Sequence, residues 1–297
     1  MTNKRKGIIL AGGSGSRLYP STESISKQLI PIYDKPMIYY PLSTLMEAGI
    51  KDILIISTPL HLPLFKLLLG DGKRFGINIS YALQENPEGL AQAFLIAEDF
   101  LNNKPSCLIL GDNLYLGAGL STLLKSASED YEKSSIFSYR VSDPSRFGVV
   151  EIDQKENIID IVEKPKKPKS NFAVTGIYFY DKNAAKYAKD LSPSARGELE
   201  ITDLNKRYIK EGNLKLKQMS SGFTWLDTGT PESLMEAANL IFTLEKRQGI
   251  KIGCPEEIAL KNGWITFEKL KEIIGENKNE YNNYLLSRVS KDDFRKT

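Results

Sequence analysis

Residues 7–18, Gly-Ile-Ile-Leu-Ala-Gly-Gly-Ser-Gly-Ser-Arg-Leu, place an apolar run directly before a glycine-rich loop. The run at Gly7–Ala11 is apolar almost throughout, which is typical of a strand buried on both faces of a parallel sheet. Glycines let backbone amides approach an anion closely, and Arg17 adds a fork of donors that suits a triphosphate. The stretch therefore predicts an α/β fold with a phosphate-binding loop at a strand end; a tight turn without a ligand is the alternative.

This loop differs from two common nucleotide-binding motifs. It does not end in Gly-Lys-Ser/Thr, so it is not a Walker loop. Leu18 stands where a dinucleotide fingerprint needs its third glycine, which argues against a dehydrogenase.

Similar apolar runs alternate with helix-length segments through the first half of the chain. We expect further strands at Ile53–Ser57, Ile79–Leu83, Cys107–Leu110, Ile136–Val141 and Ala173–Tyr180, and helices at Met37–Ala48, Leu90–Leu101 and Leu120–Tyr131. This alternation predicts a Rossmann-like mixed sheet, largely parallel and flanked by helices. After Arg140 the helical patterns become sparse, and the closely spaced runs Val149–Ile152 and Ile158–Glu163 predict a small antiparallel lobe.

Residues 230–297 have their own helical pattern. Thr230 is a suitable N-cap, Pro231 suits the first helical position, and Gly249 is a suitable stop, so a helix is expected between them. Beyond Gly249 the chain predicts two or three short helices and then a charged tail.

Composition excludes several classes of protein. Lys and Arg number 40 against 37 Asp and Glu, a balance that argues against a dedicated nucleic-acid binder. No run approaches 18 apolar residues and no signal-peptide pattern occurs, so we expect no membrane span. Only Cys107 and Cys254 are present, which suits the reducing cytoplasm. With His61 as the single histidine, the chemistry must use carboxylates, Lys, Arg and backbone groups.

Two aspartates follow or end strand-like runs. Asp112 comes just after Cys107–Leu110, and Asp227 ends the run that begins at Trp225. Ligands in open α/β sheets bind at the carboxyl ends of strands, and Mg²⁺ prefers one or two carboxylates together with phosphate oxygens. The two residues could share one Mg²⁺ if their strand ends meet, whereas either alone is more often a turn or cap residue.

Several longer motifs, in the same order along the chain, resemble those of the sugar-nucleotide pyrophosphorylases. They lie at residues 12–20, 27–29, 34–40 and 111–113. A narrower resemblance, to the members of this family that act on dTTP and glucose 1-phosphate, rests on residues 89–93, 147–151, 163–165, 174–178, 196–203 and 225–229. The similarity runs from about Lys6 to Trp264.

The resemblance implies a reaction. The phosphate oxygen of glucose 1-phosphate would attack the α-phosphorus of dTTP in line, giving dTDP-glucose and pyrophosphate with no covalent enzyme intermediate. Such a transfer depends on positioning and charge neutralisation, which agrees with a chain that has one histidine. The product would feed dTDP-rhamnose synthesis.

The resemblance also assigns roles to individual residues. It implies that the catalytic residues are Arg17, Lys27, Asp112, Lys164 and Asp227, of which Asp112 and Asp227 hold Mg²⁺. The implied nucleotide-binding residues are Gly12, Gly13, Ser14, Gly15, Ser16, Arg17, Lys27, Gln28, Gln84 and Gly89. The implied sugar-phosphate-binding residues are Asn113, Gly148, Glu163, Lys164 and Val174.

Organisation and regulation are implied in the same way. Residues 1–249 would form the nucleotidyltransferase domain, with a nucleotide-binding part at about 1–140 and a sugar-phosphate-binding part at about 141–230. Residues 250–297 would form a C-terminal helical extension. The family implies a cytoplasmic homotetramer that a downstream dTDP-sugar, dTDP-rhamnose, inhibits at a second site, and the residues after Gly249 are our candidates for that site.

Two alternatives stay open. A pocket discriminates thymine from uracil, which differ by one methyl group, by only about 1–3 kcal/mol, so a UTP-specific or other-sugar pyrophosphorylase uses the same chemistry. A non-catalytic nucleotide-sugar sensor could keep the fold, although Lys27, Asp112, Lys164 and Asp227 are all present.

Overall fold

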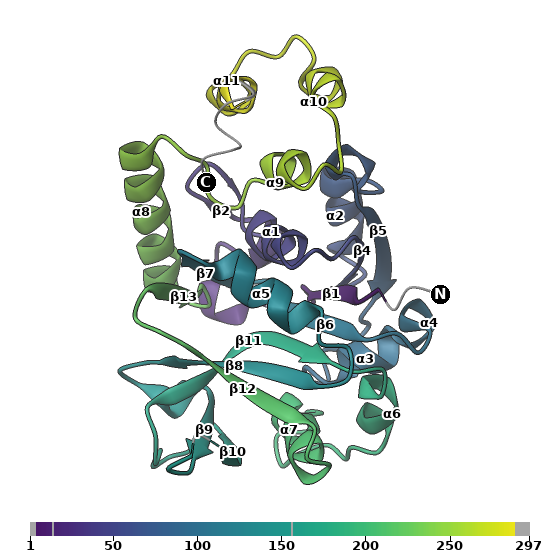
Figure 1. Cartoon of the computed structure of the whole chain (residues 1–297), viewed down its shortest axis with the longest axis vertical. Coiled ribbons are helices and arrows are strands. Elements are labelled where there is room, and N and C mark those ends of the chain that lie inside the picture. The colour runs from purple at the N-terminus through teal and green to yellow at the C-terminus, as the bar shows by residue number, and fades with distance from the viewer. Residues whose placement is uncertain (1–3, 14, 156, 289–297) are drawn as a thin grey trace.

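The computed structural model describes residues 4–13, 15–155 and 157–288. Within these residues a nine-stranded sheet crosses the molecule in the order β10-β9-β11-β6-β1-β4-β5, with β8 paired to β11 and β12 (Figure 1). One half of it is parallel and consists of β1 (Lys6–Leu10), β4 (Asp52–Ser57), β5 (Asn78–Leu83) and β6 (Ser106–Leu110). The predicted mixed, largely parallel sheet is confirmed.

The other half of the sheet is mostly antiparallel. Its strands are β8 (Ser134–Arg140), β9 (Gly148–Ile152), β10 (Ile158–Glu163), β11 (Phe172–Tyr180) and β12 (Leu214–Met219). β9 and β10 form the expected antiparallel hairpin, and β11 runs antiparallel to β6. β12 pairs parallel with β8 and was not predicted, since its Leu-Lys-Leu-Lys-Gln-Met sequence lacks a continuous apolar run.

Helices cover both faces of the sheet. α1 (Tyr39–Glu47), α2 (Leu62–Leu69) and α5 (Leu120–Ser128) contribute to one hydrophobic core, and α3 (Gln92–Ile96), α4 (Glu98–Leu101), α6 (Ala184–Lys189) and α7 (Ile201–Lys210) contribute to the other. The helix expected at Leu90–Leu101 is divided at Ala97, and that expected at Leu120–Tyr131 ends at Ser128. The described residues between Arg140 and Tyr180 contain no α-helix, as expected, but α6 and α7, which follow β11, were not predicted.

Two small ribbons lie beside the main sheet. β7 (Asn113–Gly117) pairs antiparallel with β13 (Phe223–Asp227), and β2 (Pro31–Ile32) pairs with β3 (Lys35–Pro36). Four short 3-10 turns, η1 (Ser16–Leu18), η2 (Lys27–Leu29), η3 (Lys73–Phe75) and η4 (Pro144–Arg146), connect the larger elements.

The helix predicted after Thr230 is α8 (Pro231–Gln248). Ser233 N donates to Thr230 Oγ1 at 3.3 Å, and Gly249 ends the helix with a φ of 64°, so both predicted signals are confirmed. Near its C-terminal end, the Glu245 carboxylate accepts from buried Lys35 at 2.9 Å and from Lys251 at 2.9 Å. This ion cluster fastens α8 to the β2–β3 ribbon.

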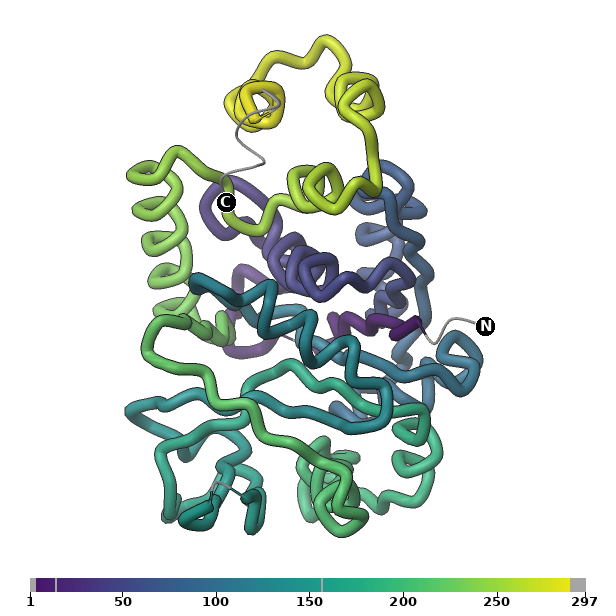
Figure 2. The backbone as a smooth tube through the Cα atoms, in the orientation of Figure 1, coloured from purple at the N-terminus to yellow at the C-terminus, as the bar shows by residue number. Residues whose placement is uncertain are grey.

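Three short helices follow α8, as predicted. α9 (Pro255–Lys261) contacts α1, while α10 (Phe267–Ile274) and α11 (Glu280–Ser287) lie at the end of the molecule farthest from the β9–β10 hairpin (Figure 2). Most of the predicted charged tail, residues 289–297, lies outside the described residues. Among the helices that are described, none is long and apolar enough to cross a membrane.

Candidate active site

A cavity of about 500 Å³ opens beyond the carboxyl end of β6 and is bounded by β9, β10, β11 and α7. This is the edge at which ligands bind in open α/β sheets. The cavity brings together eight of the residues singled out from the sequence: Arg17, Asp112, Asn113, Gly148, Glu163, Lys164, Val174 and Asp227.

The β7–β13 ribbon brings the two candidate metal ligands together. In its register Asp227 lies opposite Asn113, the residue after Asp112. The next residue, Thr228, fixes this arrangement, since its backbone N–H and its hydroxyl donate to Asp112 O at 3.1 and 2.8 Å. The sequence allowed a shared Mg²⁺ site only if the ends of the two strands lie together, and in the structure they do.

The electrostatics of the pair are unequal. Lys27 forms an ion pair with Asp112 Oδ2, and Asn113 Nδ2 donates to Asp112 Oδ1 at 3.0 Å. Burial alone would raise the pKa of Asp112, but Lys27 and Asn113 outweigh burial and hold it below its usual value. Burial and the neighbouring Asp112 carboxylate raise the pKa of Asp227, against the opposing charges of Lys27 and Arg17.

The buried Asp112 carboxylate and the partly buried Asp227 carboxylate repel one another and form an incomplete cation site. Mg²⁺ binds through one or two carboxylates and takes its remaining ligands from water and phosphate. Nowhere in the described residues do three or more His, Cys, Asp or Glu side chains gather as a metal-binding group. Asp112 and Asp227 therefore fit a metal ion that shares its coordination with a bound phosphate.

Arg17 reaches this pair from the glycine loop. A Cβ atom added to Gly229 would lie 2.5 Å from Arg17 Nη2 and 3.1 Å from Asp227 Oδ1, so Gly229 leaves room for the guanidinium beside Asp227. Gly15 starts the turn with a φ of 62°, which favours glycine. The turn is the single 3-10 turn η1 rather than an α-helix, so a helix dipole adds little here. Ser14 lies outside the described residues, and Ser16 is exposed at the start of η1.

The rest of the predicted nucleotide site surrounds the glycine loop. A Cβ on Gly12 would lie 1.9 Å from Gln84 Oε1, so the Gln84 amide sits directly against the loop backbone. Gln84 Nε2 donates to Gln92 Oε1 at 2.6 Å, which holds the amide in place. Gly89 has a φ of 106°, and a Cβ there would lie 2.4 Å from Leu199 O. Gly13 has no atom within 4 Å of its Cβ position, which leaves space beside the loop.

Lys27 and Gln28 differ in placement. Lys27 reaches Asp112, as described above, whereas Gln28 is buried. Gln28 Oε1 accepts from Ser26 Oγ at 2.5 Å, and the Gln28 side chain packs under Gly111, where an added Cβ would lie 2.9 Å from Gln28 Cγ. Gln28 therefore supports the strand end that carries Asp112, and the structure does not bring it to the cavity.

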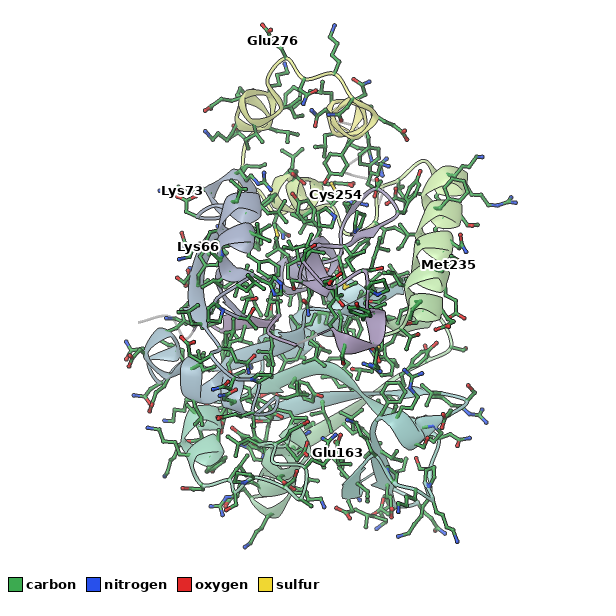
Figure 3. All side chains as sticks on the ribbon, turned by 180° about the vertical axis from the view of Figure 1, so that it is seen from behind. Lys66, Lys73, Glu163, Met235, Cys254 and Glu276 are labelled. Atoms are coloured by element: carbon green, nitrogen blue, oxygen red, sulfur yellow. The ribbon has the colours of Figure 1, made fainter. Side chains whose placement is uncertain are left out.

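The predicted sugar-phosphate residues lie on the hairpin side of the cavity. Figure 3 shows Glu163 between the β9–β10 hairpin and α7, and its Oε2 accepts from Thr202 Oγ1 at 2.5 Å. Gly148 is paired with Glu163 across the hairpin. Lys164 has a φ of 42°, an unfavourable value for a residue with a side chain, and its N–H donates to Phe147 O at 3.0 Å.

Thirteen further residues line the cavity and were not assigned a role from the sequence; five of those with polar side chains or ring nitrogens are Arg146, Arg196, Thr202, Asn205 and Trp225. Arg196 is bound by Glu200, to which Nε donates at 3.0 Å and Nη2 at 2.7 Å, and it lies 3.7 Å from Glu163. Arg196 and Thr202 belong to the motif at residues 196–203, so the resemblance to the family could have identified them as site residues. Trp225 Nε1 donates to Asn113 Oδ1 at 2.6 Å, a contact that only the folded ribbon reveals.

Comparison with known proteins identifies the family of the chain. A family model described as nucleotidyl transferase matches residues 6–243. The chain is 58% identical over 283 residues to a glucose-1-phosphate thymidylyltransferase of Xanthomonas campestris pv. campestris (95% of this chain, 96% of the relative). It is 55% identical over 287 residues to that of Neisseria meningitidis serogroup A (96% and 100%).

Solved structures show the same fold. A putative glucose-1-phosphate thymidylyltransferase from Bacillus anthracis, in complex with a sucrose, has a TM-score of 0.75 at 42% identity and covers 85% of this chain and 99% of its own. A UDP-glucose pyrophosphorylase complexed with UDP-glucose has a TM-score of 0.73 at 27% identity, covering 81% and 99%. The chain therefore belongs to the nucleotidyl transferase family and, within it, to the glucose-1-phosphate thymidylyltransferases.

Proposed function

We propose that this protein transfers a thymidylyl group from dTTP to glucose 1-phosphate, with dTDP-glucose and pyrophosphate as products. The observation that carries the proposal is one cavity with a carboxylate pair at one side and cationic groups on both flanks. Arg17 and Lys27 lie beside Asp112 and Asp227, while Lys164 lines the hairpin side. In-line phosphoryl chemistry needs this kind of positioning and charge neutralisation.

On this proposal the two flanks have different tasks. Arg17 and Lys27 neutralise the triphosphate and the departing pyrophosphate, and Lys164, with Arg196 beside it, orients the attacking phosphate of the sugar. Asp112 and Asp227 would hold Mg²⁺, which would supply further charge neutralisation at the transferring phosphate. The glycine-loop amides, with Gln84 and Gly89, bind the nucleotide, and the sugar lies against Asn113, Gly148, Glu163 and Val174.

A direct displacement suits the side chains that are present. Burial raises the pKa of both the Cys107 and Cys254 thiols well above the usual range, so neither is an activated nucleophile. His61 lies just before α2, where its Nδ1 is 3.1 Å from Thr58 Oγ1, and it does not line the cavity. The proposed mechanism therefore proceeds without a covalent enzyme intermediate.

The test is pyrophosphate release from glucose 1-phosphate with dTTP, UTP and CTP in turn, each with Mg²⁺ and with EDTA. We expect metal-dependent release that is greatest with dTTP, and some release with UTP, since the bases differ by one methyl group. Greatest release with UTP would overturn the base assignment. Nucleotide-sugar binding without any release would support the sensor instead.

We further infer that a second cavity, of about 610 Å³, is a regulatory site. It lies among α1, β7, α8 and the segment after Gly249, and Lys251, Glu257 and Lys261 from that segment line it. Lys251 is paired with Glu245 at 2.9 Å and Lys261 with Glu257 at 3.0 Å, so the diphosphate of a nucleotide sugar would bind these lysines in exchange for their carboxylate partners. On this proposal the inhibitor is dTDP-rhamnose, the enzyme is a cytoplasmic homotetramer, and residues 250–297 are a regulatory extension of the catalytic domain at 1–249.

Inhibition kinetics test the second site. Lys261→Ala is expected to weaken inhibition by dTDP-rhamnose with little change in uninhibited turnover, whereas Lys269→Ala on α10, which does not line the cavity, serves as the matched control. Equal inhibition of both variants would count against the site. Light scattering of the full chain tests the tetramer.

A further inference from the structure

Asn205 lies in the wall of the active-site cavity with half of its amide unpaired. It projects from α7 on the same face as Ile201 and Thr202, and all three line the cavity. Its side chain is 1% exposed. Its Oδ1 accepts from Tyr180 Oη at 2.6 Å, while its Nδ2 has no hydrogen-bond partner among the described residues.

The orientation of this amide follows from Tyr180. That ring is fully buried and stacked on Tyr208, with centroids 4.9 Å apart and an interplanar angle of 17°. Burial raises the pKa of Tyr180 well above its ordinary value, so the phenol keeps its proton and donates it. A phenol can also accept from an NH₂ group, but its own proton would then have no acceptor among the described residues, whereas donation to Asn205 Oδ1 satisfies it and leaves the NH₂ group unpaired.

An unpaired buried N–H is unusual in native proteins, and those that occur call for an explanation. For a residue in a cavity wall, the missing acceptor can come from a ligand that enters the cavity. One helical turn earlier, Thr202 donates to the Glu163 carboxylate. The charge of that carboxylate is offset by Arg196 at 3.7 Å and by Lys164 at 3.9 Å. A wall that combines a carboxylate acceptor with an amide donor suits hydroxyl groups, which can both donate to Glu163 and accept from Asn205.

We propose that Asn205 Nδ2 donates a hydrogen bond to one ring hydroxyl of the sugar 1-phosphate and thereby helps to set the sugar specificity of the enzyme. Tyr180 acts as a positioning residue, since it holds the amide oxygen and aims the NH₂ group. The inference rests on the proposed function for the identity of the sugar. It adds a neutral donor to a pocket in which Glu163 is the acceptor.

The experiment combines two variants with a substrate series. Asn205→Ala removes the amide, and Asn205→Asp keeps an oxygen for Tyr180 Oη while it removes the donor. Each is assayed with glucose 1-phosphate and its 2-, 3-, 4- and 6-deoxy analogues, by kcat/KM and by calorimetric titration of the sugar phosphate. Thermal unfolding establishes that both variants are folded.

We expect both variants to lose about tenfold in kcat/KM with glucose 1-phosphate, the size of one net hydrogen bond. With one deoxy analogue the same substitutions should cost less than about twofold, because the contacted hydroxyl is already absent. The KM for dTTP should not change. Tyr180→Phe should reproduce part of the loss, with the same analogue insensitive.

An equal loss with every analogue would show that Asn205 has only a structural role, and no loss with any sugar would show that it makes no contact; either result overturns the proposal. Failure of the proposed function would appear elsewhere, as a wild-type preference for another triphosphate or sugar 1-phosphate. In that case the Asn205 variants are compared with wild type on the deoxy analogues of the preferred sugar 1-phosphate. Where turnover is absent, calorimetric titration of the same analogues replaces the kinetic assay.

Discussion

Replacing Asp227 with asparagine changes one charge in the carboxylate pair and leaves the shape of the side chain intact. Asp227 lies across the β7–β13 ribbon from Asn113, and its pKa is raised by burial and by Asp112. The substitution therefore removes a proposed metal ligand and also relieves a repulsion. These two consequences act in opposite directions, on catalysis and on stability.

The magnitude for catalysis follows from the charge lost. Two unit charges about 4 Å apart interact by about 4 kcal/mol at an effective dielectric constant of about 20, a value typical of sites near a protein surface. If that interaction is made with the metal in the transition state, its loss reduces kcat/KM by about 10³-fold. Because Mg²⁺ carries two charges rather than one, this estimate of the loss in kcat/KM is a lower bound.

The assay is initial-rate pyrophosphate release with dTTP, glucose 1-phosphate and a range of Mg²⁺ concentrations. Asp71→Asn is the matched control, since Asp71 is an exposed aspartate that does not line the cavity. We expect the control to match wild type. If Asp227→Asn retained more than about a tenth of wild-type turnover, Asp227 would not be a metal ligand whose charge stabilises the transition state, and the assignment would be refuted.

Stability should change in the opposite direction. Because the folded-state pKa of Asp227 is raised, its contribution to stability is present below the pKa of a free aspartate and is lost as pH rises through the folded-state pKa. Metal-free Asp227→Asn should therefore unfold at a higher temperature than metal-free wild type at neutral pH. The difference in unfolding temperature between the variant and wild type should shrink in acid. Thermal unfolding at several pH values measures it, and a variant that is less stable than wild type at neutral pH would contradict the prediction.

Three other substitutions test separate parts of the site. Arg196→Gln should raise the KM for glucose 1-phosphate about tenfold and leave the KM for dTTP unchanged, and an equal effect on both substrates would argue against a role at the sugar phosphate. Gly89→Ala should lower the free energy of unfolding by about 2 kcal/mol or more in denaturant titrations, since its Cβ would meet the Leu199 backbone at 2.4 Å with a positive φ. Ser16→Ala should change kcat/KM by less than about threefold, because Ser16 is exposed at the start of η1; a large loss would show that its hydroxyl contacts the nucleotide.

The parts of the fold that could be predicted are those with a local signal. The apolar run before the glycine loop became β1, and the Thr230, Pro231 and Gly249 signals gave both ends of α8. β12 was missed because its Leu and Lys residues alternate, as in a strand with one exposed face, whereas the predicted strands are continuous apolar runs. Its strand conformation depends on pairing with β8, which is a tertiary interaction.

The candidate site divides in the same way. The candidate metal ligands Asp112 and Asp227 each stood out beside a strand-like run, but only the β7–β13 register brings them together. The unpaired donor of Asn205 had no sequence signal, because it arises when Tyr180 occupies the amide oxygen. Residue type could therefore be predicted at several positions, whereas the direction of each polar group depends on contacts between distant segments.

The ion pair between Lys27 and Asp112 connects the free enzyme with the proposed reaction. In the absence of substrate, Lys27 offsets the charge of Asp112, and this is why Asp112 stays ionised although it is buried. A triphosphate brings additional negative charge, and a metal ion bound at Asp112 would compete directly with the Lys27 ammonium. The flexible Lys27 side chain is then free to pair with a phosphate oxygen. One lysine can therefore keep the site close to neutral before substrate binds and neutralise the departing pyrophosphate afterwards.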